Sequence, residues 1–518
     1  MFTTTLSGGL SGIESYLVRV EVDTAQSLPG FDMVGMLGSE VKEARERVRV
    51  ALKNTGIRVP PVHITVNLSP ADIRKEGTAF DLPIAVGVLT SLQFVPEDHT
   101  KDMIFLGELG LNGEVKAVRG VLPIVLAARE NGIACCVVPK ENEQEACVVQ
   151  GVRVIGVQSL AQLRDDLCAP PGGRRKKMAY TKRKVPAPGN NEGQEPDFAD
   201  VNGQPAVRRA VEIAAAGFHH LMLIGPPGSG KTMIAKRIPS VLPPLSFEES
   251  LEVSKIYSVS GLLHADQSLI TKRPFLSPHH TISKYALTGG GRVPLPGAIS
   301  LAHRGVLFLD ELPEFGREVI DLMRQPLEDK QVHIARSCAS YTYPADFMLV
   351  AAMNPCPCGY YPDHNRCSCT PGEIRRYLSR ISGPILDRID LCVEAPRLSI
   401  GEISAEQKNE SSAAIRERVA AARERQKFRF KGTPYRFNTD LGTGELKRYV
   451  PLRAAQRKLL EQIFQTMNLS ARAYHRIIRL ARTIADLEGS EDVLERHISE
   501  AACYRVTDAN DWITMGRS

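Results

Sequence analysis

The chain lacks segments that would direct it to a membrane. Met1 to Thr5 is not a basic stretch followed by an apolar core, so we do not expect a signal peptide. No apolar run reaches the ~18 residues that a membrane-spanning helix requires. With 43% hydrophobic and 24% charged residues, the composition is that of an ordinary soluble globular protein. We therefore expect a cytoplasmic protein with no membrane partner.

A broadly basic surface is also absent, although the net charge is +6. Seven basic and no acidic residues lie between Arg174 and Lys184, and subtracting these seven from +6 leaves about −1 for the remainder. The excess is therefore a local tract. A disulfide framework is not expected either, because the eleven cysteines lie in a long chain without an export signal and are typical of thiols or metal ligands.

The 518-residue chain is too long for a single core, and its pattern predicts four parts. Residues 1–168 alternate strand-like and helix-like runs, which predicts a compact α/β or α+β domain. Residues 169–200 are rich in Pro, Gly, Asn and basic side chains, which predicts a flexible linker. Residues 201–400 predict a doubly wound parallel sheet, and residues 401–518 predict a helical domain. The helices expected in the first part are Ser39 to Asn54, Asp81 to Leu92 and Val121 to Asn131.

A phosphate-binding loop follows the apolar strand predicted at Leu221 to Ile224. The loop reads G-x-x-x-x-G-K-T and runs into a helix, which is the setting that this motif requires and which argues against a merely structural glycine-rich turn. Its N–H groups and the helix dipole favour phosphate. We expect Lys231 to contact the β- and γ-phosphates of ATP, and Thr232 to supply a hydroxyl to Mg²⁺. The predicted nucleotide-binding residues are Gly225, Pro226, Pro227, Gly228, Ser229, Gly230, Lys231, Thr232 and Asp310.

Two further apolar strands end in polar residues suited to ATP hydrolysis. Val306 to Leu309 is followed by Asp310 and Glu311, at the end of the strand where open α/β sheets bind ligands. We predict that Asp310 holds Mg²⁺ through water and that Glu311 polarises the attacking water. Asn354 follows another apolar strand and is predicted to orient that water. Each pattern alone also fits a strand with a solvated end, an interpretation that the neighbouring phosphate-binding loop disfavours.

In this order the motifs resemble those of AAA+ ATPases. Longer strings at 273–283, 289–315, 351–359 and 384–391 resemble the magnesium-chelatase-like AAA+ family of the YifB and ComM type, and the resemblance covers essentially the whole chain. It implies an α/β P-loop motor with a helical C-terminal lid. For the ComM type it further implies a hexameric helicase that acts on single-stranded and branched DNA and drives branch migration during natural transformation and homologous recombination.

The same resemblance assigns roles to two arginines. Arg388, in L-D-R-I-D-L, matches the arginine finger that reaches the γ-phosphate of a neighbouring subunit, and such fingers contribute about 10³–10⁵ in rate. Arg380 is the alternative finger. Arg472 matches the sensor-2 arginine of the lid helix. Each of these arginines also fits a surface ion pair, which is the commoner environment of arginine.

Residues 331–343 alternate in polarity, which predicts a β-hairpin inserted before the strand that ends at Asn354. Chelatase and helicase relatives carry such a hairpin into the central pore of the ring. Lys330, His333 and Arg336 are therefore candidate contacts to DNA phosphates. A solvated hairpin edge explains the pattern equally well.

The first part resembles the Lon protease fold through residues 105–129 and the V-V-P at 137–139, but it lacks the catalytic groups. Lon proteases need a serine after a K-D-G-P-like turn and a lysine on a later helix. Here the turn at 75–81 holds no serine, and Ile124 stands in place of the lysine. Without a nucleophile or a base there is no acyl transfer. We predict a degenerate Lon-like domain that serves DNA binding or ring assembly.

Four of the eleven cysteines form two C-x-C pairs, Cys356 with Cys358 and Cys367 with Cys369. Four thiolates can form a tetrahedral site, which predicts a structural Zn²⁺. His364, in the polar loop between the pairs, could replace one cysteine. Four reduced thiols on a surface loop are the alternative.

Three other functions are weighed against a DNA motor. A magnesium-chelatase motor subunit is disfavoured by the Lon-like domain and the C-x-C pairs. A scaffold without enzymatic activity is disfavoured because Lys231, Asp310 and Glu311 are all present. An ATP-dependent protein remodeller is the alternative that the sequence excludes least.

Overall fold

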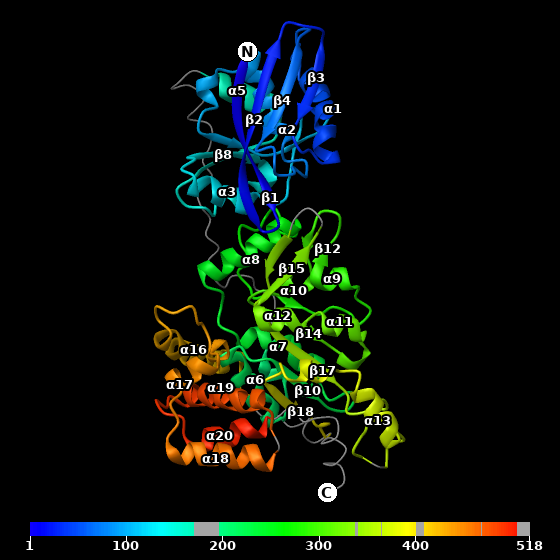
Figure 1. The fold of residues 1–518 in the computed structure, drawn as a ribbon, viewed down its shortest axis with the longest axis vertical. Coiled ribbons are helices and arrows are strands. Elements are labelled where there is room, and N and C mark those ends of the chain that lie inside the picture. Colours follow the sequence, from blue (N-terminus) through cyan, green and yellow to red (C-terminus); the bar gives the residue numbers. More distant parts are fainter. Residues whose placement is uncertain (170–195, 337–339, 364, 400–408, 468, 505–518) are drawn as a thin grey trace.

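Three parts follow one another along the protein, as Figure 1 shows. The N-terminal domain forms one end, the sheet-containing core lies in the middle, and the helical lid packs beside the core. No described helix is long and apolar enough to cross a membrane. The computed structural model describes residues 1–169, 196–336, 340–363, 365–399, 409–467 and 469–504.

A seven-stranded sheet organises the N-terminal domain. Its strands lie in the order β3 (Gly30–Val34), β4 (His63–Ser69), β2 (Glu14–Ala25), β1 (Phe2–Ser11), β5 (Met103–Phe105), β8 (Cys135–Pro139) and β9 (Arg153–Val157). A two-stranded ribbon adds β6 (Glu108–Leu109) and β7 (Val115–Lys116). The helices are α1 (Ser39–Asn54), α2 (Asp81–Ser91), α3 (Val121–Glu130), α4 (Glu143–Ala146) and α5 (Leu160–Cys168). All residues of α2 are buried, as its almost wholly apolar sequence requires.

Five parallel strands form the sheet of the core. Their order is β11 (Phe275–Leu276), β14 (Val306–Leu309), β17 (Met348–Met353), β10 (Leu221–Ile224) and β18 (Leu391–Glu394). Every residue of β10, β14 and β17 is buried, as in parallel sheets covered on both faces. Alternate residues of β10 enter different hydrophobic clusters: Leu221 and Leu223 face the cluster shared with the lid, whereas Met222 and Ile224 face the other.

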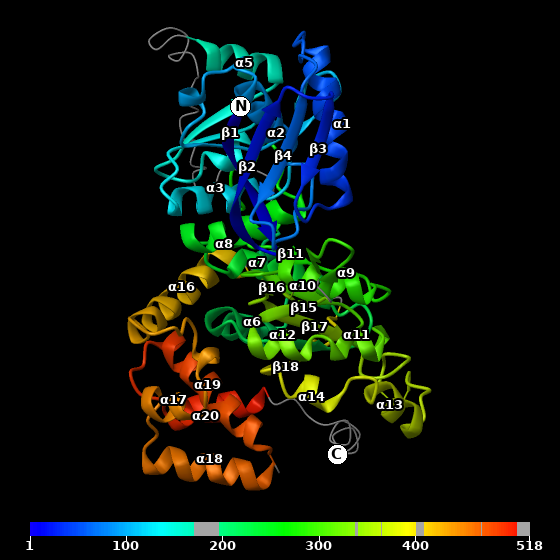
Figure 2. The ribbon, with the colours of Figure 1, turned by 45° about the horizontal axis from the view of Figure 1, so that its top comes forward.

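Short helices and two hairpins complete the core. The helices are α6 (Pro205–Gly217), α7 (Lys231–Val241), α8 (Phe247–Ser260), α9 (Lys284–Thr288), α10 (Ala298–Leu301), α11 (Arg317–Asp321), α12 (Arg324–Asp329), α13 (Pro371–Leu378) and α14 (Gly383–Leu386). The hairpins pair β12 (Gly289–Gly290) with β13 (Leu295–Pro296), and β15 (Gln331–Ala335) with β16 (Ser340–Pro344). In both views α13 lies on the opposite side of the core from the lid (Figures 1 and 2).

Five helices make up the described part of the lid. They are α16 (Ser412–Arg429), α17 (Thr443–Tyr449), α18 (Ala454–Thr466), α19 (Ala471–Glu488) and α20 (Glu495–Cys503). The apolar face of α19 joins the same cluster as Leu221 of β10. Phe218, after α6, stacks on Phe437 of the lid with ring centroids 5.1 Å apart. One continuous hydrophobic cluster therefore fixes the lid to the core.

The predicted linker ends earlier than residue 200. Most of it, residues 170–195, lies outside the described residues. Phe198, however, is fully buried in the cluster that the core and lid share. Its backbone N–H donates to Ser412 Oγ at 2.8 Å, and Ser412 N–H donates to Asp197 Oδ1 at 2.9 Å. Asp197 and Phe198 therefore belong to the core, because burial of the phenyl ring favours that packing.

The N-terminal domain docks on α8 through a buried carboxylate. Glu145 of α4 accepts hydrogen bonds from Leu122 N–H, at 2.9 Å, and from the hydroxyl of Ser258 in α8. Gly120 N–H donates to the carbonyl of Ser258 at 3.0 Å. Burial raises the pKa of Glu145, although its hydrogen bonds from Ser258, from Leu122 N–H and from the Asn142 amide oppose that effect. These polar contacts fix α3 and α4 against the core.

Candidate functional site

The phosphate-binding loop leaves β10 and turns directly into α7. Gly230, which precedes α7, has φ 84°, a conformation that favours glycine. A Cβ on Gly225 would lie 2.2 Å from the Ala395 carbonyl oxygen, so only glycine fits beside the end of β18. The N–H groups at the start of α7 thus face the space above the carboxyl ends of the strands, where a phosphate can bind.

Lys231 lies inside this loop and is 8% exposed. Its Nζ donates to the carbonyls of Gly225, at 2.7 Å, and Pro226, at 3.0 Å, and to Asn354 Oδ1 at 3.2 Å. Burial lowers the pKa of Lys231, an effect that the carboxylates of Asp310 and Glu311 oppose. Phosphate oxygens are stronger acceptors than these neutral groups, so the ammonium can exchange them for a nucleotide.

Thr232 and Asp310 form the second part of the site. The Thr232 hydroxyl donates to Asp310 Oδ2 at 2.6 Å, and the other Asp310 oxygen accepts Glu311 N–H at 3.0 Å. A hydroxyl and a carboxylate side by side are the hard oxygen donors that Mg²⁺ prefers, and Mg²⁺ commonly binds one or two carboxylates together with nucleotide phosphates. The donor set therefore fits Mg²⁺.

Glu311 has a strained backbone, with φ 53° and ψ 47°. A left-handed conformation is uncommon for a residue other than glycine and is concentrated at functional sites. The Glu311 side chain is 60% exposed, and its Oε2 lies 3.8 Å from His280 Nδ1. His280 in turn stands 4.0 Å from His279, measured between ring centroids. The proximity of His280 to Glu311 escaped the sequence analysis, since 31 positions separate the two residues.

Asn354 lies between the lysine and the acidic residues because β17 lies between β10 and β14. Its side chain contacts Lys231, and its backbone lies near the Tyr377 hydroxyl of α13, where it opposes the rise that burial causes in the pKa of that group. The structure therefore gathers Lys231, Thr232, Asp310, Glu311 and Asn354 at one edge of the sheet. This is the arrangement that the sequence motifs predict.

Arg388 lies at the opposite edge of the sheet. It precedes β18, whereas Lys231 follows β10, and these two parallel strands pair Leu221 with Leu391. A four-residue strand is about 13 Å long, so Arg388 is far from the nucleotide site of its own chain. Its Nη2 pairs with Glu328 Oε2 at 2.7 Å.

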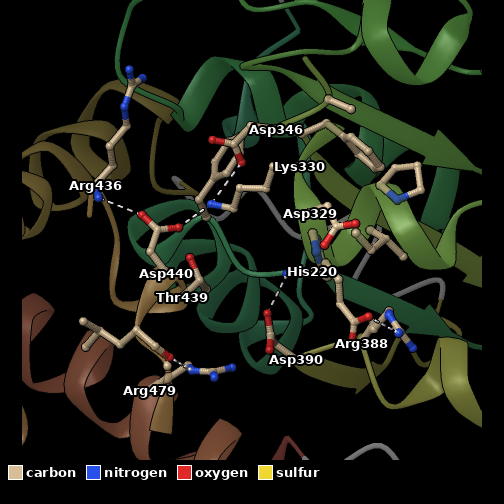
Figure 3. Close-up of a pocket in the computed structure, with 18 of the residues that line it drawn as sticks. His220, Asp329, Lys330, Asp346, Arg388, Asp390, Arg436, Thr439, Asp440 and Arg479 are labelled. Carbon is tan, nitrogen blue, oxygen red and sulfur yellow. Dashed lines mark hydrogen bonds and ion pairs between the residues drawn. The ribbon is translucent and has the colours of Figure 1, made fainter. Parts of the chain in front are cut away.

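The lid arginine lies at that same edge. Arg472 Nη2 is 3.3 Å from Glu328 Oε1, so the two predicted arginines share one carboxylate. They help to line a cavity of about 840 Å³ between the core and the lid, seen in Figure 3. Arg380, the alternative finger, instead pairs with Glu314 at 2.8 Å, near Glu311.

The hairpin predicted before β17 is present as β15 and β16, and Lys330 at its base already has ion-pair partners within the chain. Its ammonium pairs with Asp346, at 3.3 Å, and with Asp440 of the lid, as Figure 3 shows. Burial alone would lower the pKa of Lys330, but the two carboxylates outweigh it and raise the pKa. Because the charge of Lys330 is already neutralised within the chain, the exposed His333 and Arg336 are the better candidates for DNA contacts.

The other two hairpin candidates remain exposed. His333 Nδ1 lies 2.9 Å from Thr342 Oγ1 across the hairpin, and Arg336 donates to the Gly291 carbonyl at 2.9 Å. Tyr341 of β16 lies against Gly12, in the turn between β1 and β2 of the N-terminal domain. The hairpin therefore contacts the N-terminal domain on one side and the core on the other.

The four predicted cysteines come together. The Sγ atoms of Cys356, Cys358, Cys367 and Cys369 all lie within 4.8 Å of one another. Three of the separations are 3.3, 3.8 and 3.6 Å. A tetrahedral site with Zn–S bonds of about 2.3 Å requires sulfur separations of about 3.8 Å. The arrangement thus fits a Cys₄ zinc site, and His364 lies outside the described residues.

The sheet order, the phosphate-binding loop and the acidic strand end define an AAA+ ATPase of the P-loop class. The chain belongs to the magnesium-chelatase-like AAA+ family of the YifB and ComM type. The family profile "Magnesium chelatase, subunit ChlI" matches residues 197–403, and its C-terminal profile matches residues 409–505. A third profile, "Subunit ChlI of Mg-chelatase", matches residues 20–142.

Relatives of nearly the same length support this membership. Competence protein ComM of Haemophilus influenzae is 42% identical over 499 residues, which is 95% of each chain. YifB of Escherichia coli K12 is 42% identical over 501 residues, 96% of each chain. Lon protease 2 of Bacillus subtilis is 28% identical over 174 residues, 31% of each chain, in keeping with a degenerate Lon-like domain.

Two substitutions should separate binding from hydrolysis. Lys231→Ala removes the cation that meets the phosphates and should weaken ATP binding about 10²-fold or more, since charged hydrogen bonds contribute about 1.5–3 kcal/mol each. Glu311→Gln should keep ATP affinity but lower turnover about 10²–10⁴-fold, since an amide cannot accept the proton of water. Binding of a fluorescent ATP analogue and single-turnover hydrolysis distinguish them. Equal affinity and equal turnover in both variants would refute these separate roles.

Proposed function

We propose that the protein is a cytoplasmic, ATP-driven DNA motor that works as a ring, most simply a hexamer. The placement of Arg388 and Lys231 at opposite edges of one sheet carries this proposal. An arginine that cannot reach the nucleotide of its own chain can stabilise the transition state only in a neighbouring chain. In a closed ring, the sheet edge that carries Arg388 in one chain meets the sheet edge that carries the nucleotide site in the next chain. Every nucleotide site then receives an arginine from its neighbour.

At such an interface, each of several residues has a separate role in ATP hydrolysis. Lys231 and the N–H groups of the loop bind the phosphates, and Thr232 and Asp310 hold Mg²⁺, which neutralises phosphate charge when bound. Glu311 accepts the proton of the attacking water, which Asn354 orients. Arg388 of the adjacent chain stabilises the charge that develops on the γ-phosphate. Because Arg472 shares Glu328 with Arg388, we assign it to the same neighbouring nucleotide.

DNA is the substrate that the relatives support. The Haemophilus influenzae relative is named a competence protein, and competence is the state in which cells take up DNA. We propose that the motor binds single-stranded and branched DNA in the ring and migrates branch points during natural transformation and recombination. His333 and Arg336 of the hairpin are the proposed phosphate contacts. The N-terminal domain, without a protease nucleophile, is proposed to aid DNA binding or assembly.

The four-cysteine cluster is proposed to hold a structural Zn²⁺. The buried Cys356 Sγ accepts hydrogen bonds from the backbone N–H groups of Gly359, at 3.2 Å, and Tyr361, at 3.4 Å. Such donors stabilise a metal-bound thiolate. Zinc would tie the end of β17 to the start of α13, since Cys369 directly precedes the N-cap Thr370.

Mixed rings test the action of Arg388 between chains. Arg388→Ala should still bind ATP but hydrolyse it about 10³–10⁵ times more slowly. Lys231→Ala is inactive but keeps its arginine, so mixing the two variants creates some complete interfaces and should restore activity. Native mass spectrometry verifies that mixed rings form. Rings that demonstrably contain both chains and yet show no recovery would place the action of Arg388 within its own chain.

DNA remodelling tests the proposed function. ATPase rates should rise with single-stranded, forked or four-way-junction DNA, and the wild-type protein should separate a labelled junction into duplexes. Glu311→Gln should bind the junction but not separate it. Affinity should fall steeply with salt and vary little with sequence, because phosphates dominate binding. A protein that hydrolyses ATP, ignores every DNA and unfolds a protein substrate would instead be a protein remodeller.

Metal analysis tests the zinc site. Purified protein should contain about one zinc per chain, as a single Cys₄ site requires. Cys358→Ser should lose the metal and melt at a lower temperature, whereas Cys168→Ser, at an exposed cysteine of the N-terminal domain, should retain zinc. Wild-type protein that contains no zinc when prepared without chelator would contradict the assignment.

A further inference from the structure

The cysteine cluster is joined to the nucleotide site by two short paths. Cys356 stands two residues after Asn354, whose side chain contacts Lys231. The cluster also continues into α13, whose Tyr377 hydroxyl lies near the backbone of Asn354. Asn354 is therefore flanked on both sides by segments that the four cysteines connect. Neither path is required for a cluster that only stabilises a surface loop.

A third contact reaches the phosphate-binding loop itself. Gly359, one residue after Cys358, has φ 85°, and a Cβ added there would lie 2.5 Å from Pro227 Cδ and 3.7 Å from Asn354 Cγ. The backbone of the cysteine loop thus rests directly on the phosphate-binding loop. The N–H of Gly359 also donates to Cys356 Sγ at 3.2 Å, so the residue that touches Pro227 is itself hydrogen-bonded to the cluster.

We infer that the metal-bound cysteine loop is a positioning element of the ATPase site, which sets Pro227 and Asn354 against the phosphates. This rests on the zinc site proposed above and adds a function to it: ATP affinity and turnover depend on metal occupancy at the cluster. The metal takes no part in the chemistry. It holds together a loop of turns and polar residues that would otherwise be free to move away from Pro227.

The burial of the four cysteines indicates that loss of the metal would affect the cysteine loop and not the sheet. Cys356 is fully buried and belongs to the hydrophobic cluster on one face of the core sheet, together with Met353 of β17. The other three cysteines are only partly buried and pack against the same cluster. Cys356 therefore anchors the loop in the core, and the metal would fix Cys358, Cys367 and Cys369 to that anchor. Loss of metal should release the loop without unfolding the sheet.

A pair of glycine substitutions tests this coupling without removing a ligand. Gly359→Ala forces Pro227 or the cysteine loop to shift by about 1 Å, since carbon atoms in contact lie about 3.5 Å apart or more. Such a displacement can lower kcat/KM about 10- to 100-fold. Gly151→Ala is the matched control: its φ is 84°, so the backbone strain is similar, but its Cβ would meet nothing within 4 Å.

We expect Gly359→Ala to keep its zinc while its affinity for a fluorescent ATP analogue and its kcat/KM both fall. Gly151→Ala should lose a similar amount of thermal stability and show wild-type ATP kinetics. Cys358→Ser should lose zinc and ATP affinity together. Cys358→His supplies a different zinc ligand and should recover both relative to the serine variant, which a purely steric role for the cysteine would not allow.

All measurements are made without DNA, so failure of the DNA-motor proposal would not affect them. Zinc content is measured directly, so failure of the metal site is also seen separately. Equal kcat/KM in Gly359→Ala and Gly151→Ala would overturn the coupling. So would removal of zinc from folded wild-type protein, with circular dichroism unchanged, if the affinity for the ATP analogue stayed the same.

Discussion

The common direction of the five core strands determines where every polar group of the ATPase lies. Parallel strands bring all their carboxyl ends to one edge, so the phosphate-binding loop, Asp310 and Asn354 meet there although up to 129 positions separate them. Adjacent strands are about 4.8 Å apart, and β17 lies between β10 and β14, so the carboxyl ends of β10 and β14 are about 10 Å apart. The other edge, by the same rule, receives Arg388.

The accessory domains attach to this sheet in chemically different ways. The lid shares a continuous hydrophobic cluster with one face of it, so any movement of the lid has to deform or shift that packing. The N-terminal domain instead docks through the buried Glu145 and its donors on α3 and α8. It also touches the hairpin, where Tyr341 meets Gly12. A displacement of the hairpin would therefore also shift the β1–β2 turn.

The sequence predicts those parts of the site that depend on local motifs. The helix expected from Ser39 to Asn54 is α1 with the same bounds, because its apolar residues recur at helical spacing, and the continuous apolar run expected as a strand from Leu221 to Ile224 is β10. Features that depend on distant partners could not be predicted. Lys330 forms an ion pair with Asp440, which lies 110 positions away, and no local sequence pattern indicates that pair. The close contact between Gly359 and Pro227 likewise arises only in the folded chain and has no local sequence signal.

The shared partner of Arg388 and Arg472 bears on assembly. Glu328 is half-exposed and pairs with both arginines, so an isolated chain presents an edge whose positive charges are partly neutralised. An exposed ion pair such as that of Arg472 contributes only about 0–1 kcal/mol, whereas the Arg388 side chain is only 12% exposed; a triphosphate offers both arginines several charge-assisted hydrogen bonds. A neighbouring chain that has bound ATP can therefore attract the arginines away from Glu328. A neighbouring chain without ATP offers them no comparable anionic partner. In the proposed ring, subunit cohesion would then rise and fall with nucleotide occupancy, interface by interface.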